Sequence, residues 1–151
     1  MALETPSYYR YYAQTYRLDA TPDGGVKGTI LDLRTGLFEE NNEHIREVLF
    51  ARDSFDIGKL TEEKFVQETE AARLAYLRGD GPIFALYDTI KGIDAVADKE
   101  KRSRTTQETA LVFALYKRTF KLWEEEAARR AAGEPPSFQV TTRWQQADPE
   151  R

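Results

Sequence analysis

The chain has 151 residues, with 26 acidic and 22 basic side chains, a formal net charge of −4 and no cysteine. This length suffices for one domain with a hydrophobic core, and the lack of cysteine excludes disulfide bonds, thiolate zinc sites and a cysteine nucleophile. The longest apolar run, residues 110–116, is much shorter than the ~18 residues of a membrane span, and no cleavable signal pattern follows Met1. We therefore expect a soluble, cytoplasmic protein that has no membrane partner.

Residues 5–16 hold five of the eight tyrosines and fit two kinds of secondary structure. A helix capped by Thr5 would align the tyrosines at positions 8, 12 and 16 on one face. A strand would use the high β-propensity of tyrosine instead and continue past residue 16. The Pro-Asp-Gly-Gly sequence at 22–25 is typical of a tight turn between two strands, which favours the strand. We predict a small antiparallel β-hairpin or meander over residues 15–39.

The hydrophobic period changes from two to about three and a half after Asn42, which indicates helices. The spacing predicts a short helix over residues 44–52 and a longer one over 61–78, with Gly79 at the C′ position of the second. A third helix is predicted to begin near Ile83, because apolar residues recur at intervals of three and four as far as residue 97.

The last predicted helix has the clearest signals. Thr105 and Glu108 form a capping-box sequence, and the helix should end before Gly133 and two prolines. Its buried seam is expected to repeat at intervals of three and four residues through Phe113, Tyr116, Phe120, Trp123 and Ala127.

The segment after Pro135 and Pro136 alternates between apolar and polar residues, which is a strand pattern. Its apolar positions are Phe138, Val140 and Trp144, with Thr142 between the last two. Such a segment can add a strand to the chain's own sheet or complete the sheet of a neighbouring molecule. We favour the first of these two arrangements.

These patterns together predict the α+β class. We expect a small N-terminal antiparallel β-hairpin or meander packed on a three- to four-helix bundle, with a C-terminal extended or strand-like tail. The expected boundaries are a single α+β domain over 1–133, β-rich over 8–39 and helical over 42–133, and a tail over 134–151.

No catalytic motif is present in the sequence, since phosphate-binding glycine loops, HExxH and GxSxG are all missing. The single histidine, His44, follows Glu40 by four residues, and the two would share a helix face if the helix began early enough. A small enzyme with an acidic and histidine site near residues 39–47 is therefore one alternative. We favour a surface histidine beside acidic residues that offset the helix dipole, and expect no catalytic residue, no metal and no cofactor.

The consecutive glutamates at 124–126 do not converge on a cation, because successive helical residues point about 100° apart. We interpret this run as solvated, with Glu125 and Glu126 facing Arg129 and Arg130 one turn later.

Charge is unevenly distributed along the chain. Residues 36–70 contain ten acidic and four basic residues, whereas residues 99–121 contain seven basic and two acidic ones. The candidates for contact with phosphates or with an acidic partner are Lys99, Lys101, Arg102 and Arg104. A solvated loop between helices explains the same basic run more simply.

We expect a non-catalytic protein–protein interaction module, such as an assembly component, adaptor or regulator, that binds a protein partner or a second copy of itself. The expected partner-binding residues come from a tyrosine-rich N-terminal arm and the tail: Tyr8, Tyr9, Tyr11, Tyr12, Phe138, Val140 and Trp144. One alternative is a regulator that binds a nucleic-acid-processing machine, such as a transcription complex, through the basic region 99–121. Nucleic acid is not expected to be the main partner, because the net charge is negative.

Overall fold

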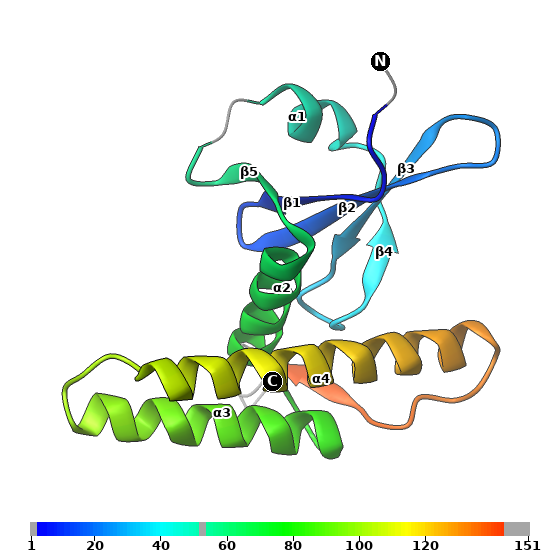
Figure 1. The fold of residues 1–151 in the computed structure, drawn as a ribbon. Helices are drawn as coiled ribbons and strands as arrows, with labels where there is room; N and C mark the ends of the chain where they lie inside the picture. Colours follow the sequence, from blue (N-terminus) through cyan, green and yellow to red (C-terminus); the bar gives the residue numbers. More distant parts are fainter. Residues whose placement is uncertain (1–2, 52–53, 144–151) are drawn as a thin grey trace. The chain divides into compact units, whose positions relative to one another are not determined.

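A computed structural model describes residues 3–51 and 54–143 of the chain (Figure 1). Within these residues, a five-stranded antiparallel sheet is combined with four helices and a separate pair of short strands, which confirms the α+β class. The chain divides into two compact units, Met1–Arg73 and Leu74–Arg151. We call them the sheet unit and the hairpin unit and describe each by itself.

The sheet unit is built on five strands in the order β4-β3-β2-β1-β5, and each neighbouring pair is antiparallel. The strands are β1 (Ser7–Tyr11), β2 (Gln14–Ala20), β3 (Val26–Leu31), β4 (Phe38–Glu40) and β5 (Ile57–Leu60). The predicted meander is confirmed, and of the two structures considered for the tyrosine-rich segment the strand is correct. This segment, β1, lies inside the sheet between β2 and β5 rather than on a separate arm.

Side chains alternate between the two faces of the sheet, so adjacent tyrosines of β1 point in opposite directions. Tyr9 is paired with Tyr16 of β2, and both are buried against Val48 of the short helix α1 (Ile45–Phe50). The ring of Tyr8 lies on the opposite face, with its centroid 4.7 Å from that of Phe65 on α2 (Glu62–Tyr76). One face of the sheet is therefore covered by α1 and the other by the first part of α2.

Polar contacts add to the packing between α2 and the sheet. Arg10 of β1 donates two hydrogen bonds to the carboxylate of Glu68, at 2.8 and 2.6 Å. Near the end of the sheet unit, the buried Arg73 guanidinium donates to the Gly36 carbonyl at 2.9 and 2.6 Å and to Glu70 at 2.6 Å. These bonds satisfy a buried ion pair, which would be costly if either member lost its partner.

The hairpin unit contains two helices, α3 (Pro82–Lys99) and α4 (Thr106–Ala131), which lie side by side and antiparallel in Figure 1. Its two short strands, β6 (Leu77–Gly79) and β7 (Val140–Thr142), pair with each other in the antiparallel sense. Trp123 of α4 is buried and donates a hydrogen bond of 2.9 Å from its indole nitrogen to the Tyr87 hydroxyl of α3. This contact joins the two helices at the centre of their shared core.

Several expectations about the helices need correction. The helix predicted over 61–78 ends at Tyr76, and Gly79 belongs to β6 rather than to a C′ position. Gly79 is in β6 because its backbone pairs with Val140 of the C-terminal segment, a contact that local sequence does not reveal. The capping box is confirmed, since the backbone N–H groups of Glu108 and Thr105 each bond to the other residue's side chain.

The buried seam of α4 is only partly as predicted. Tyr116 and Trp123 are buried, whereas Phe113 and Phe120 are only half-buried and Ala127 is exposed. The other buried positions of this helix are Val112, Thr119 and Glu126. The polar members of this set can be buried because each has hydrogen-bond partners in the hairpin unit.

The tail contributes a strand to its own chain, as we favoured, but to β6 rather than to the N-terminal sheet. Residues 137–142 therefore belong to the hairpin unit, although we expected them in a separate tail over 134–151. The helix packing observed within this unit is that of α3 on α4.

Candidate functional site

Of the four β1 and turn tyrosines predicted to bind a partner, three are held by contacts within the sheet unit. Tyr9 is in the core, and Tyr8 packs on Phe65. The ring of Tyr11 stacks on His44, with 4.2 Å between centroids, and its hydroxyl donates to the Glu47 carboxylate at 3.1 Å. Tyr12 is the exception: it occupies the β1–β2 turn with a positive φ of 56° and is 55% exposed.

Two phenylalanines that sequence reasoning missed are more exposed than any of these tyrosines. Phe50, the last residue of α1, is 78% exposed, and Phe55, in the connection from α1 to β5, is 92% exposed. The backbone N–H of Tyr12 donates to the Asp56 carbonyl at 2.6 Å, which places the turn beside this connection. We call Tyr12, Phe50 and Phe55 the aromatic rim. A large aromatic residue within a polar connection was the available sequence signal.

The tail residues Phe138 and Val140 are half-buried in the hairpin unit. The ring of Phe138 makes edge contacts with Trp123 at 5.2 Å and Phe84 at 5.8 Å between centroids, and the Arg130 guanidinium lies 5.3 Å from its centre. Phe138 is therefore part of an aromatic cluster of its own unit. Trp144, the remaining predicted contact of the tail, lies outside the described residues.

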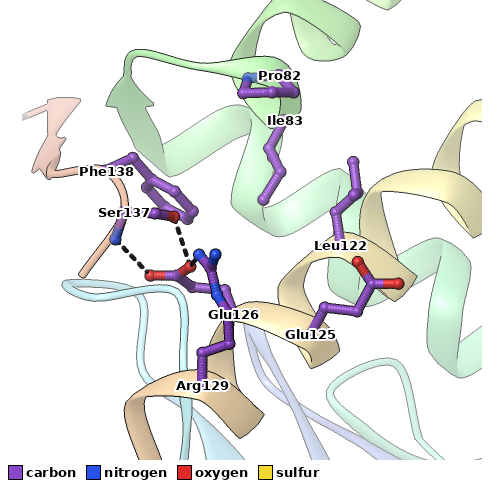
Figure 2. A pocket seen from close by; sticks show the side chains of 8 residues that line it. All are labelled: Pro82, Ile83, Leu122, Glu125, Glu126, Arg129, Ser137 and Phe138. Carbon is purple, nitrogen blue, oxygen red and sulfur yellow. Dashed lines mark hydrogen bonds and ion pairs between the residues drawn. The ribbon is translucent and has the colours of Figure 1, made fainter. Parts of the chain in front are cut away.

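Glu126 fixes the start of this tail segment (Figure 2). Its carboxylate accepts from the backbone N–H of Ser137 at 3.0 Å, from the Ser137 hydroxyl at 2.6 Å and from Arg130 at 2.7 Å, and it also pairs with Arg129. The side chain is only 2% exposed, so the expectation of a solvated glutamate is wrong, although its pairing with Arg130 is confirmed. Burial alone would raise the pKa of Glu126, but the bonds from Ser137 and the two arginines outweigh it and lower the pKa to about 2.

A cavity of about 360 Å³ lies beside this carboxylate, and Figure 2 shows the side chains around it. Ile83, Leu122 and Phe138 give it apolar walls, and Glu125 and Arg129 also line it. Both oxygens of Glu126 are engaged by Ser137 and the arginines. The Glu126 carboxylate therefore stabilises the contact between α4 and the tail segment, and its low pKa makes it a poor general base.

A second cavity of about 410 Å³ lies between β6, α3 and the tail, and we call it the β6–α3 cavity. It is lined by Leu77, Arg78, Gly79, Asp80, Phe84, Tyr87, Asp88, Lys91, Gln139 and Thr141. Burial and then the Arg78 guanidinium lower the pKa of Lys91, whereas the Asp88 carboxylate raises it. Two cationic side chains thus share one concave, partly apolar space.

The basic loop is less available than its sequence suggested. Arg102 pairs with Glu108 at 2.8 Å, and Arg104 donates to both oxygens of Asp94 at 2.6 and 2.8 Å. These arginines lower the pKa of Asp94 and, together with the Thr105 backbone, that of Glu108 to about 2. Lys99 and Lys101 are exposed. A phosphate contact through Arg102 or Arg104 would have to displace carboxylates of the same unit, while the alternative of nucleic-acid binding stays a prediction.

His44 and Glu40 do not share a helix face, because Glu40 ends strand β4 and α1 begins only at Ile45. His44 instead contacts Glu47 at 3.2 Å, and Glu40 accepts a hydrogen bond from Asn42 at 3.2 Å. Within residues 3–51 and 54–143, no group of three or more histidine, aspartate or glutamate side chains is arranged to hold a metal ion. The proposed acidic and histidine site is thus divided between two elements.

Comparison with known proteins finds no matching family model, no matching curated protein and no matching solved structure. In the part of the chain that the structure describes, no helix is both long and apolar enough to cross a membrane.

Proposed function

We propose that this chain is a non-catalytic protein–protein interaction module, and that it contacts its partner through the aromatic rim of the sheet unit. The observation that carries the proposal is the exposure of Phe50 and Phe55, at 78% and 92% of their surfaces. Leaving two large aromatic side chains in water forfeits the burial free energy of roughly 1.5–3 kcal/mol that each would gain in a contact. Exposed aromatic side chains are enriched at protein-binding surfaces.

The charges around the aromatic rim indicate the chemistry of the partner. Three exposed carboxylates lie in this part of the sheet unit: Glu43 just before α1, Glu47 on α1 and Asp56 in the connection from α1 to β5. They belong to the acidic region 36–70, which has a balance of −6. The partner is therefore expected to present apolar side chains surrounded by basic ones, since complementary charges steer association and oppose wrong pairings.

Photo-crosslinking from one position of the rim tests this proposal. A photoreactive benzoyl-phenylalanine replaces Phe55 in the protein produced in its source cells, and the same residue replaces Leu111 of α4 as a control. Leu111 is a matched position because it is apolar and 49% exposed but lies in the hairpin unit. We expect a discrete crosslinked protein from position 55, absent from position 111.

The Phe50→Ser substitution should reduce that product by about tenfold, as expected when a large apolar contact is lost. Raising the salt concentration from about 50 to 500 mM should weaken it as well, because exposed charges are screened. A product whose mass is twice that of the chain would identify the partner as a second copy and supports the proposal. Equal labelling from positions 55 and 111, or no response to Phe50→Ser, would overturn it.

A further inference from the structure

The β6–α3 cavity contains two cations whose charges are not neutralised by ion pairs. Across residues 3–51 and 54–143, no carboxylate lies within ion-pair distance of Arg78 or Lys91. Burial and then the nearby Arg78 charge lower the pKa of Lys91, and the Asp88 carboxylate opposes them only in part. An anion between the two side chains would relieve this repulsion.

The Arg78 guanidinium, which lines this cavity, is partly fixed in position by the backbone. Its Nη1 donates to the backbone carbonyl of Leu77, the first residue of β6, at 2.8 Å and to that of Leu74 in the last turn of α2 at 3.4 Å. Both bonds use Nη1, and no acceptor in the described residues is bonded to Nε or Nη2. An arginine held in this way loses little side-chain freedom when its other donors bind a ligand, and its planar group matches a carboxylate.

Two further features of the lining select among anions. Asp80 and Asp88 face the same cavity, so a doubly charged phosphate meets two negative charges, whereas a single carboxylate carries less charge to repel. Phe84 and Tyr87 also line the space and supply aromatic surface for the body of an organic molecule. The volume of about 410 Å³ is in the range of small-molecule sites.

We propose that the β6–α3 cavity binds a small organic acid, with Arg78 and Lys91 holding its carboxylate and the aromatic side chains contacting its body.

Titration of the full chain with benzoate, followed by amide NMR, tests the site. Benzamide is the matched probe, because it has the same shape without the charge, and inorganic phosphate is the anion without an apolar body. We expect benzoate to shift the amide signals of Arg78, Gly79 and Lys91 in a saturable manner. Benzamide should bind about tenfold more weakly or worse, as loss of a charge-assisted contact predicts. Phosphate should also bind at least about tenfold more weakly, because it meets the charges of Asp80 and Asp88 and has no apolar body to contact the aromatic side chains.

Two substitutions connect the binding to the two cations. Lys91→Gln should weaken benzoate binding by about tenfold. Arg78→Gln should do the same, but it also removes bonds to the end of α2, so Lys91→Gln provides the independent test. Lys117→Gln on the exposed part of α4 is the charge-matched control and should leave binding unchanged. Equal binding of benzamide and benzoate, tighter binding of phosphate, or equal weakening by Lys117→Gln and Lys91→Gln would overturn the assignment.

Discussion

Glu126 is buried, although the sequence around it suggests an exposed side chain. It is the third of three consecutive glutamates, and it alone among them is buried, because residues 137 and 138 return to α4 at that helical turn. Four donors surround its two oxygens, so the cost of burying the charge is offset by charge-assisted hydrogen bonds. The side chain thus fixes the C-terminal segment to α4.

Replacing Glu126 with glutamine should therefore destabilise the protein, although the two side chains have nearly the same shape. The amide cannot accept at both positions, and it leaves buried donors without a partner. We expect the free energy of unfolding to fall by about 1–3 kcal/mol in urea denaturation near neutral pH. Glu125→Gln on the neighbouring exposed position is the control and should change it by less than about 0.5 kcal/mol. Equal effects of the two substitutions would contradict the proposed role of Glu126 in fixing the C-terminal segment to α4.

Two glycines of the hairpin unit have opposite roles and permit a matched test of close packing. A Cβ at Gly79 would lie 2.7 Å from the Phe84 ring and 2.8 Å from the Gln139 carbonyl oxygen, whereas a Cβ at Gly92 of α3 would meet nothing within 4 Å. Gly79→Ala should lower the free energy of unfolding by about 1–3 kcal/mol, because β6 cannot approach α3 and β7 as closely. Gly92→Ala should raise it by about 0.5–1 kcal/mol, because alanine favours the helix. Urea denaturation of both variants measures the two signs, and a stabilised Gly79→Ala variant would contradict the packing described.

The predictability of each element depended on where its contacts lie. The turn at residues 22–25 and the Thr105 cap were predicted because their hydrogen bonds stay within a few residues. The predicted buried face of α4 differs from the observed one. Thr119 and Glu126 are polar, so the sequence alone indicates exposed positions, and their burial is explained only by the hydrogen bonds that the fold provides. The cavity cations Arg78 and Lys91 were missed for the same reason, since β6 exists only through pairing with a segment far along the chain.

At the scale of the whole molecule, the net charge of −4 does not reveal that the carboxylates of the two units differ in their pKa shifts. In the hairpin unit, ion pairs and hydrogen bonds lower the pKa of Asp94 and hold those of Glu108 and Glu126 at about 2. In the sheet unit, burial and the nearby Asp32 raise the pKa of Glu39, while the exposed Asp23 has a lowered pKa. Carboxylates with lowered pKa values therefore predominate in the hairpin unit.

A carboxylate with a lowered pKa stabilises the folded state fully above its unfolded pKa and loses that contribution as the pH falls through its folded pKa. For Glu108 and Glu126 this window runs from 4.5 down to about 2. Glu39 contributes to stability with the opposite dependence on pH: its pKa is raised in the folded protein, so its protonation at low pH favours the folded state. We expect amide NMR signals of the hairpin unit to disappear at a higher pH than those of the sheet unit during acid titration, and Glu126→Gln to reduce the pH dependence of the hairpin unit. Earlier loss from residues 7–73, or simultaneous loss, would contradict this order.

Because β6 pairs with β7, which lies far along the chain, β6 cannot pair until β7 has been synthesised. Val140 is translated about 60 residues after its partner Gly79, which at ~5–20 residues per second corresponds to roughly 3–12 s. During that interval the edge of β6 has no strand to pair with, while the contacts of the α3–α4 pair become available first. An unpaired edge is a site for wrong pairing between chains. Slow translation of the last fifteen residues would therefore be expected to raise the aggregated fraction of newly made protein.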